Sequence, residues 1–123
     1  MFEPWLRKFA NAFHGVRLGV EGQNSFLVHL PLAASVLILA WLLRCSPWQW
    51  CVLVLCIALV LSLELLNSAL EHLARGLCSE HNAQVGKALD IASAAVLLVS
   101  VAAAAVGLLI FVLQGWAWWN RSA

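Results

Sequence analysis

Three long apolar stretches constrain the fold of this sequence more than any other feature. They span residues 26–43, 48–70 and 91–113, and the first and third contain no charged side chain. At a rise of about 1.5 Å per residue, helices of these lengths can cross a hydrocarbon core of about 30 Å. Hydrophobic residues make up 63% of the 123 positions and charged residues only 11%, which is more apolar surface than a small soluble domain can bury. The sequence therefore predicts an all-α membrane protein with three transmembrane helices.

The first 23 residues predict an N-terminal amphipathic helix that lies in the membrane interface. Apolar side chains recur at helical intervals and share one face, whereas the charged side chains fall outside it. The apolar face consists of Phe2, Trp5, Leu6, Phe9, Phe13, Val16 and Val20. A helix of this kind lies flat with its apolar face toward the lipid. We therefore expect one integral-membrane domain over residues 1–123, with a surface helix at 1–23 followed by the three spans.

The distribution of basic and aromatic residues predicts the orientation. Five basic residues fall on the N-terminal side or between spans two and three: Arg7, Lys8, Arg17, Arg75 and Lys87. Two fall on the other side, Arg44 and Arg121, where six tryptophans also gather: Trp41, Trp48, Trp50, Trp116, Trp118 and Trp119. Because basic residues are retained in the cytoplasm, we expect a bacterial inner-membrane protein with a cytoplasmic N-terminus, a cytoplasmic polar loop over 72–90 and a periplasmic C-terminus.

Several classes of function find no support in the sequence. The formal net charge of +1 gives no indication of a nucleic-acid partner. The four cysteines form no C-x-x-C pair, and Cys78 with His81 makes only an isolated C-x-x-H half-site for zinc. Neither a Walker A loop nor a protein-kinase signature is present.

The most informative motif lies at the end of the second span. Glu64, Asn67, Ser68 and Glu71 are offset by 3, 4 and 7 residues, so they share one helix face. If Trp50 marks the outer boundary, Glu64 lies roughly 21 Å further in and Glu71 roughly 31 Å, at the cytoplasmic edge. A charged side chain at the centre of a span costs about 2.5–3.5 kcal/mol, and such residues are usually functional.

Each of the two acids has a functional and a structural interpretation. Glu64 could serve as a general base, or as a protonated acid that pairs with a neighbouring helix. Glu71, close in sequence to Lys87 and Asp90, could bind Mg²⁺, which takes one or two carboxylates together with substrate phosphates. Alternatively, Glu71 belongs to a solvated helix end. A buried acid is also compatible with a small proton-coupled transporter.

The sequence resembles the prokaryotic diacylglycerol kinase and undecaprenol kinase family. The resemblance rests on Glu64-Leu-Leu-Asn-Ser-Ala-Leu-Glu71 and on Gly86-Lys-Ala-Leu-Asp90-Ile-Ala-Ser-Ala-Ala-Val96, with looser matches at Phe9–Gly15 and Asn24–Leu30. It implies a homotrimer of three-span subunits. It also implies transfer of the γ-phosphoryl group of ATP, with Mg²⁺, to a membrane lipid alcohol, either diacylglycerol or undecaprenol.

The resemblance also implies roles for individual residues. Glu64 would be the catalytic base and would contact the lipid substrate, together with Ser93 and Phe26. The nucleotide would bind at Glu71, Asn67, Asp90, Lys87 and His81. The metal would bind Glu71, with Gln23 at the position of a second family glutamate.

Four positions depart from the family pattern and predict a weakened enzyme. Gln23 replaces a glutamate, Leu89 a lysine, Asn11 a tyrosine and Arg75 an acid. Because phosphoryl transfer depends mainly on positioning and electrostatics, we expect low activity with a raised KM for Mg·ATP. The alternative is a non-catalytic family member that binds lipid or a partner.

Overall fold

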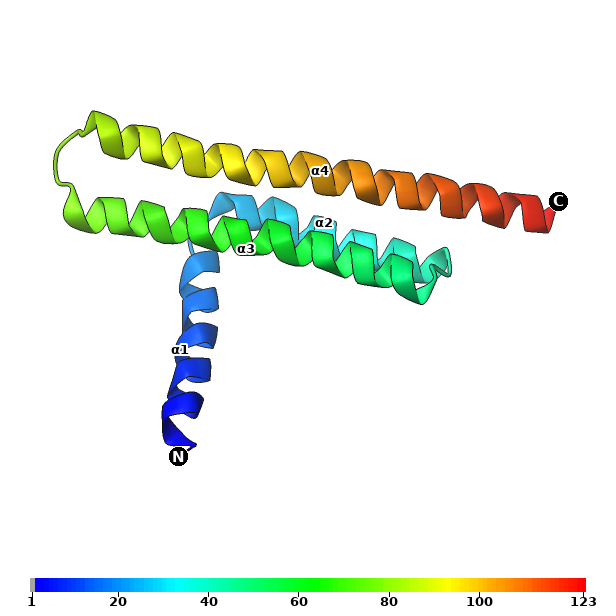
Figure 1. Cartoon of the computed structure of the whole chain (residues 1–123), viewed down its shortest axis with the longest axis horizontal. Coiled ribbons are helices and arrows are strands. Elements are labelled where there is room, and N and C mark those ends of the chain that lie inside the picture. Colours follow the sequence, from blue (N-terminus) through cyan, green and yellow to red (C-terminus); the bar gives the residue numbers. More distant parts are fainter. Residues whose placement is uncertain (1) are drawn as a thin grey trace.

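The structure is a computed structural model that describes residues 2–123, and this part of the chain forms four helices. They are α1 (Glu3–Val20), α2 (Asn24–Leu42), α3 (Pro47–Leu77) and α4 (Ala83–Ser122). Helices α2, α3 and α4 lie side by side, and α1 projects away from them at a steep angle, with only its C-terminal end touching the bundle (Figure 1). The last three are long and apolar enough to cross a membrane. The prediction of an all-α protein with three candidate spans and an N-terminal helix is therefore confirmed.

Helix α1 ends where Gly22 adopts a φ of +77°, a conformation that glycine reaches without strain. This turn redirects the chain from α1 into α2. Most of the apolar face of α1, including Trp5, Phe9 and Phe13, is exposed in the isolated chain. Such exposure fits a helix whose apolar face contacts lipid instead of protein.

Helix α3 is the centre of the bundle. Helix α4 packs along one side of it, whereas the C-terminal end of α1 meets the opposite side (Figure 1). The end of α1 approaches α3 closely because the contact occurs at Gly19: a Cβ atom there would lie 2.5 Å from Cδ2 of Leu65. A small residue at a helix contact in a membrane allows this approach.

The end of the bundle that carries the α2–α3 turn is held by apolar packing and one side-chain clamp. Ala40, Cys45, Leu53 and Ile110 form a buried cluster there, and burial raises the pKa of the Cys45 thiol above its usual value. Gln114 of α4 donates hydrogen bonds to the carbonyl oxygens of Leu43, at 2.9 Å, and of Arg44, at 3.2 Å. The clamp satisfies carbonyls that the end of α2 leaves free.

The predicted polar loop over residues 72–90 is wrong in extent, because only residues 78–82 lie outside helices. Helix α3 continues past the predicted span to Leu77, and α4 begins at Ala83 and runs to Ser122. A helix satisfies its own backbone groups whether lipid or water surrounds it, so the end of an apolar stretch does not end the helix. Asn82 caps α4 by accepting hydrogen bonds from the N–H groups of Gln84 and Val85.

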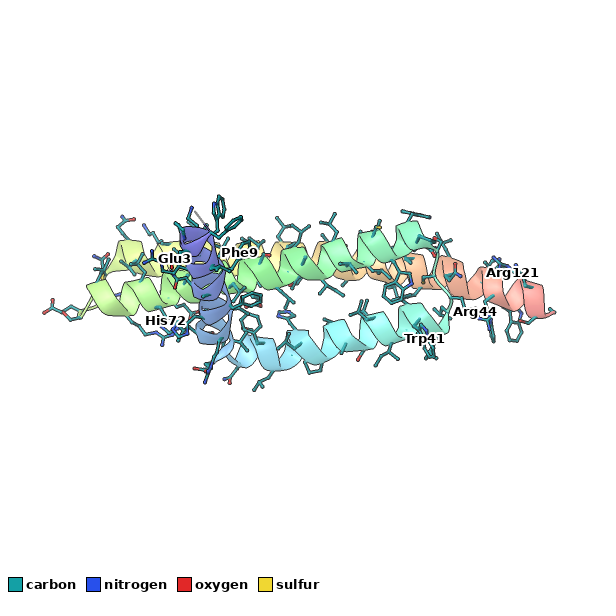
Figure 2. The ribbon with its side chains drawn as sticks, turned by 90° about the horizontal axis from the view of Figure 1, so that it is seen from below. Glu3, Phe9, Trp41, Arg44, His72 and Arg121 are labelled. Carbon is teal, nitrogen blue, oxygen red and sulfur yellow. The ribbon has the colours of Figure 1, made fainter. Side chains whose placement is uncertain are left out.

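The two ends of the bundle differ in the side chains that they carry. Trp41, Arg44 and Arg121 lie toward one end, whereas Glu3 and His72 lie toward the other (Figure 2). Helix α4 also projects beyond the α2–α3 turn, carrying its tryptophan-rich C-terminal turns with it (Figure 1). Arg44 and Arg121, which the sequence assigns to the same side of the membrane, thus lie toward the same end of the bundle, and the orientation itself stays a prediction.

Candidate active site

Glu64 is the most deeply buried acid of the candidate site. It lies on α3 with its side chain 4% exposed, and Nδ1 of His29, from α2, lies 2.8 Å from its Oε1. The ring N–H is not aligned with that oxygen, and Nδ1 has no hydrogen-bond partner within residues 2–123. The two groups are therefore at ion-pair distance without being locked into a hydrogen bond. The contact brings a polar residue of the first span against the acid of the second.

One helical turn further along α3, Ser68 anchors the surface helix. Its side chain is buried, and its Oγ donates a 3.2 Å hydrogen bond to the backbone carbonyl of Gly19. Phe26, at the start of α2, is 3% exposed. The contact between α1 and α3 is thus fixed directly beside Glu64 by one polar bond and close packing. The helical spacing predicts this face for Ser68 but does not identify Gly19 as its partner.

Glu71 lies two turns beyond Glu64 and is half-buried, with 30% of its side chain exposed. It accepts hydrogen bonds from Nδ2 of Asn67 at 3.1 Å, from Nε2 of Gln23 at 3.3 Å and from Nη2 of Arg75 at 3.1 Å. Gln23 is therefore adjacent to Glu71, although the two residues are 48 positions apart. Arg75 forms an ion pair with the same carboxylate.

The residues around Glu71 suit a magnesium ion that is shared with phosphate groups. No cluster of three or more His, Cys, Asp or Glu side chains occurs in the part of the chain that the structure describes. However, Oδ1 of Asn67 is buried without a hydrogen-bond partner, and the amide of Gln23 is close by. One carboxylate and amide oxygens, completed by phosphates, form the oxygen donor set that Mg²⁺ prefers. The positive charge of Arg75 on the same carboxylate opposes that binding.

The remaining predicted site residues are not brought to Glu64 or Glu71. The side chains of these residues are exposed and have no hydrogen-bond or ion-pair partner within residues 2–123: His81, Lys87, Asp90 and Ser93. The last three lie on α4, which packs on the side of α3 opposite to the α1 contact (Figure 1). A single chain therefore assembles only the part of the site that α3 carries.

An apolar groove runs along the spans beside Glu64. Its volume is about 300 Å³, and His29 and Ser100 are its polar members. Oγ of Ser100 is buried without a partner in the described chain. The groove is lined by His29, Leu32, Ala33 and Val36 of α2, by Leu53, Cys56, Ile57, Val60 and Leu61 of α3, and by Ser100, Ala103, Ala104, Gly107, Leu108 and Phe111 of α4. His29 thus belongs both to the groove and to the surroundings of Glu64.

His29 is the residue that sequence reasoning missed. It lies in the Asn24–Leu30 segment and received no role. The available signal was a lone histidine in an otherwise uncharged span, since ionisable residues inside spans usually have a partner. The identity of that partner could not be read from sequence spacing.

Comparison with known proteins gives a consistent result. A family model described as "Prokaryotic diacylglycerol kinase" matches residues 10–111. The undecaprenol kinase of Bacillus subtilis is 33% identical over 107 residues, which cover 87% of each chain. The diacylglycerol kinase of a Synechocystis species is 36% identical over 103 residues, which cover 83% of this chain and 59% of that protein. No solved structure matches significantly.

Proposed function

The chain belongs to the prokaryotic diacylglycerol kinase family, and on this premise we propose that it transfers the γ-phosphoryl group of ATP to the hydroxyl of a membrane lipid alcohol. The observation that carries the proposal is the placement of two acids on one face of α3. Glu64 is buried and Glu71, two turns further along the helix, is partly exposed; we expect Glu64 at the depth of a lipid hydroxyl and Glu71 at the aqueous edge. Lipid and nucleotide can therefore approach the same helix from opposite directions.

In the proposed reaction, Glu64 is the general base. Its carboxylate takes the proton of the lipid hydroxyl while the lipid oxygen forms a bond to the γ-phosphorus of ATP and ADP leaves. Glu71, with the amide oxygens of Asn67 and Gln23, would hold Mg²⁺, which neutralises phosphate charge when bound. Asn67 donates to Glu71 and thereby fixes the carboxylate for this role.

We favour undecaprenol over diacylglycerol as the lipid. The undecaprenol kinase of Bacillus subtilis matches this chain over 87% of its own length, whereas the Synechocystis diacylglycerol kinase is matched over 59%. The apolar groove that His29 lines has a volume of about 300 Å³, which suits a segment of one hydrocarbon chain of either lipid. Diacylglycerol remains the alternative that the assay below tests.

We also propose that the active unit is a homotrimer in which a second copy completes the site. Asp90, Lys87 and Ser93 are exposed on α4 and have no polar partner within residues 2–123. Small residues along the same helix would let another copy approach closely. Asp90 and Lys87 of a neighbouring α4, together with His81, would then contact the nucleotide, and Ser93 the lipid, whereas Phe26 is 3% exposed and supports the site by packing.

The proposed orientation places ATP on the correct side of the inner membrane. A reporter fused after Ala123 should report the periplasm, and a reporter inserted at Asn82 should report the cytoplasm, because basic residues favour the cytoplasmic side. The reverse pattern would separate Glu71 from cytoplasmic ATP and would overturn the site assignment.

A non-catalytic lipid-binding protein is the second candidate, and one observation favours it. Arg75 occupies the Glu71 carboxylate at 3.1 Å and so opposes metal binding there, while Gln23 and Leu89 remove a carboxylate and a lysine that the family pattern contains. We propose that these changes raise the KM for Mg·ATP without abolishing transfer.

The deciding experiment incubates the purified protein in mixed micelles with labelled ATP, Mg²⁺ and either undecaprenol or diacylglycerol. We expect labelled lipid phosphate, more with undecaprenol, and none with the Glu64→Gln variant. A folded wild-type protein that labels neither lipid would refute the kinase proposal for these substrates and favour the non-catalytic candidate.

A further inference from the structure

His29 is the feature of the site that the proposed function leaves unexplained. It is the only residue within residues 2–123 that makes an ion-pair or hydrogen-bonding contact with Glu64, with 2.8 Å between Nδ1 and Oε1. Its side chain is 20% exposed, whereas that of Glu64 is 4% exposed. A carboxyl in such a place needs a polar partner, because water cannot solvate it.

His29 lies between Glu64 and the apolar groove. The same side chain lines the apolar groove between α2, α3 and α4, so it borders both the acid and the space open to a hydrocarbon chain. None of the groove residues from α4 is ionisable, and from α3 only the Cys56 thiol is. The groove therefore offers no other charged group that could orient the Glu64 carboxyl.

We propose that His29 is a positioning residue that holds the Glu64 carboxylate toward the lipid hydroxyl, with its Nδ1–H directed at Oε1. The inference rests on the proposed kinase function. The contact is at ion-pair distance but not aligned as a hydrogen bond, so a small reorientation of either side chain completes it. When the hydroxyl is bound, His29 occupies one carboxylate oxygen and leaves the other free to accept the proton.

Two substitutions of His29 separate positioning from packing. In His29→Leu the donor is lost in a setting where leucine inserts readily, whereas in His29→Asn a side-chain N–H near the place of Nδ1 is retained. We expect kcat to fall roughly ten- to a hundredfold in His29→Leu, since a misplacement of about 1 Å can cost about 10²-fold. The KM for Mg·ATP should stay within about twofold. His29→Asn should keep kcat within about fivefold of wild type.

A second background tests whether His29 acts through Glu64. In Glu64→Asp the carboxylate is one methylene shorter and is withdrawn from His29. There, His29→Leu should lower kcat by less than about twofold, because residues that act as a unit are not additive. His14, an exposed histidine of α1, provides the matched control, and His14→Leu should leave kcat unchanged.

The outcomes distinguish this inference from the proposed function. If wild type phosphorylates a lipid and folded His29→Leu keeps full kcat, the positioning role is wrong while the kinase stands. Equal losses in folded His29→Leu and His29→Asn would also overturn it, as would equal losses in the wild-type and Glu64→Asp backgrounds. If His29→Leu does not fold, the kcat of folded His29→Asn is compared with that of its parent in the wild-type and Glu64→Asp backgrounds. A fall of more than about fivefold in the wild-type background, or equal falls in both, would overturn the inference. A wild type that phosphorylates no lipid refutes the kinase and this inference with it.

Discussion

The candidate site consists of an α3 half, with Glu64, Ser68 and Glu71, and an α4 half, with Asp90 and Ser93. The side chains of the two halves are held in different ways. On α3, Glu64 contacts His29, Ser68 bonds the Gly19 carbonyl, and Glu71 accepts three hydrogen bonds. On α4, Asp90 and Ser93 are exposed and have no polar partner within residues 2–123. The first half is positioned by the chain itself, whereas the second half faces outward.

This difference indicates what each half requires. Polar groups that must lie in an apolar environment need partners, and the α3 half obtains them from α1 and α2. Asp90 and Ser93 of the α4 half are exposed on this chain, so a partner for them must come from outside it. We therefore expect substitutions on α3 to act within one subunit and substitutions on α4 to act across a subunit boundary.

The largest effect is expected from Glu64→Gln, which keeps the size of the side chain and removes the base. Lipid phosphorylation should fall by at least about 10²-fold, because general bases contribute about 10²–10⁴-fold. Insertion and oligomerisation, measured by membrane extraction and size-exclusion chromatography, should be unchanged. Activity within about threefold of wild type would remove Glu64 from the role of base.

A mixing experiment tests whether the two halves come from different chains. Asp90→Asn and Glu64→Gln should each be inactive alone. Because a shared site in a mixed oligomer can combine an intact α3 half with an intact α4 half, co-assembly of the two variants should restore measurable phosphorylation. Co-assembled protein that stays inactive would mean that one chain supplies both halves. An oligomer assembled from Glu64→Gln chains alone is the control, since every site in it lacks the base and should stay inactive.

The same comparison shows how far the sequence could predict the structure. The three spans and the shared face of Glu64, Asn67 and Glu71 are local properties of helical spacing, so they were predictable. The hydrogen bond between Ser68 and Gly19 joins residues 49 positions apart. The contact of His29 with Glu64 likewise joins two different helices, α2 and α3. These contacts depend on how the helices pack, which no local pattern encodes. Helix ends were missed for a related reason, since composition marks the lipid boundary and not the last helical turn.

Gly19→Val tests the attachment of the surface helix to the α3 half. A side chain there would meet Leu65, because even a Cβ atom would lie 2.5 Å from its Cδ2. Overpacking costs about 1–3 kcal/mol, and the lower end is expected because Cδ2 is the tip of a half-buried side chain that can partly turn away. The unfolding midpoint in an SDS titration followed by circular dichroism should therefore fall. Gly15→Val is the matched control, because nothing lies within 4 Å of a Cβ at Gly15. Equal midpoints for the two variants would show that the close approach at Gly19 contributes nothing.

The smallest effect is expected from Gln23, which lies beside Glu71, and from Leu89 on α4, which replace a glutamate and a lysine of the family pattern. Gln23→Glu would place a second carboxylate beside Glu71, where Gln23 now donates a 3.3 Å hydrogen bond. Without metal the two carboxylates repel each other, and a divalent cation relieves that repulsion. The double variant Gln23→Glu with Leu89→Lys should therefore lower the KM for Mg·ATP severalfold.

That double variant has a readout that does not depend on catalysis. Its thermal stability should be lower than that of wild type without Mg²⁺ and should rise more steeply as Mg²⁺ is added, since a ligand stabilises the folded state that binds it. Arg75→Gln should move the magnesium dependence in the same direction, because it removes the cation that now pairs with Glu71. If neither variant changes the response to Mg²⁺, Glu71 is not part of a metal site. The α3 half would then be limited to Glu64 and its immediate neighbours.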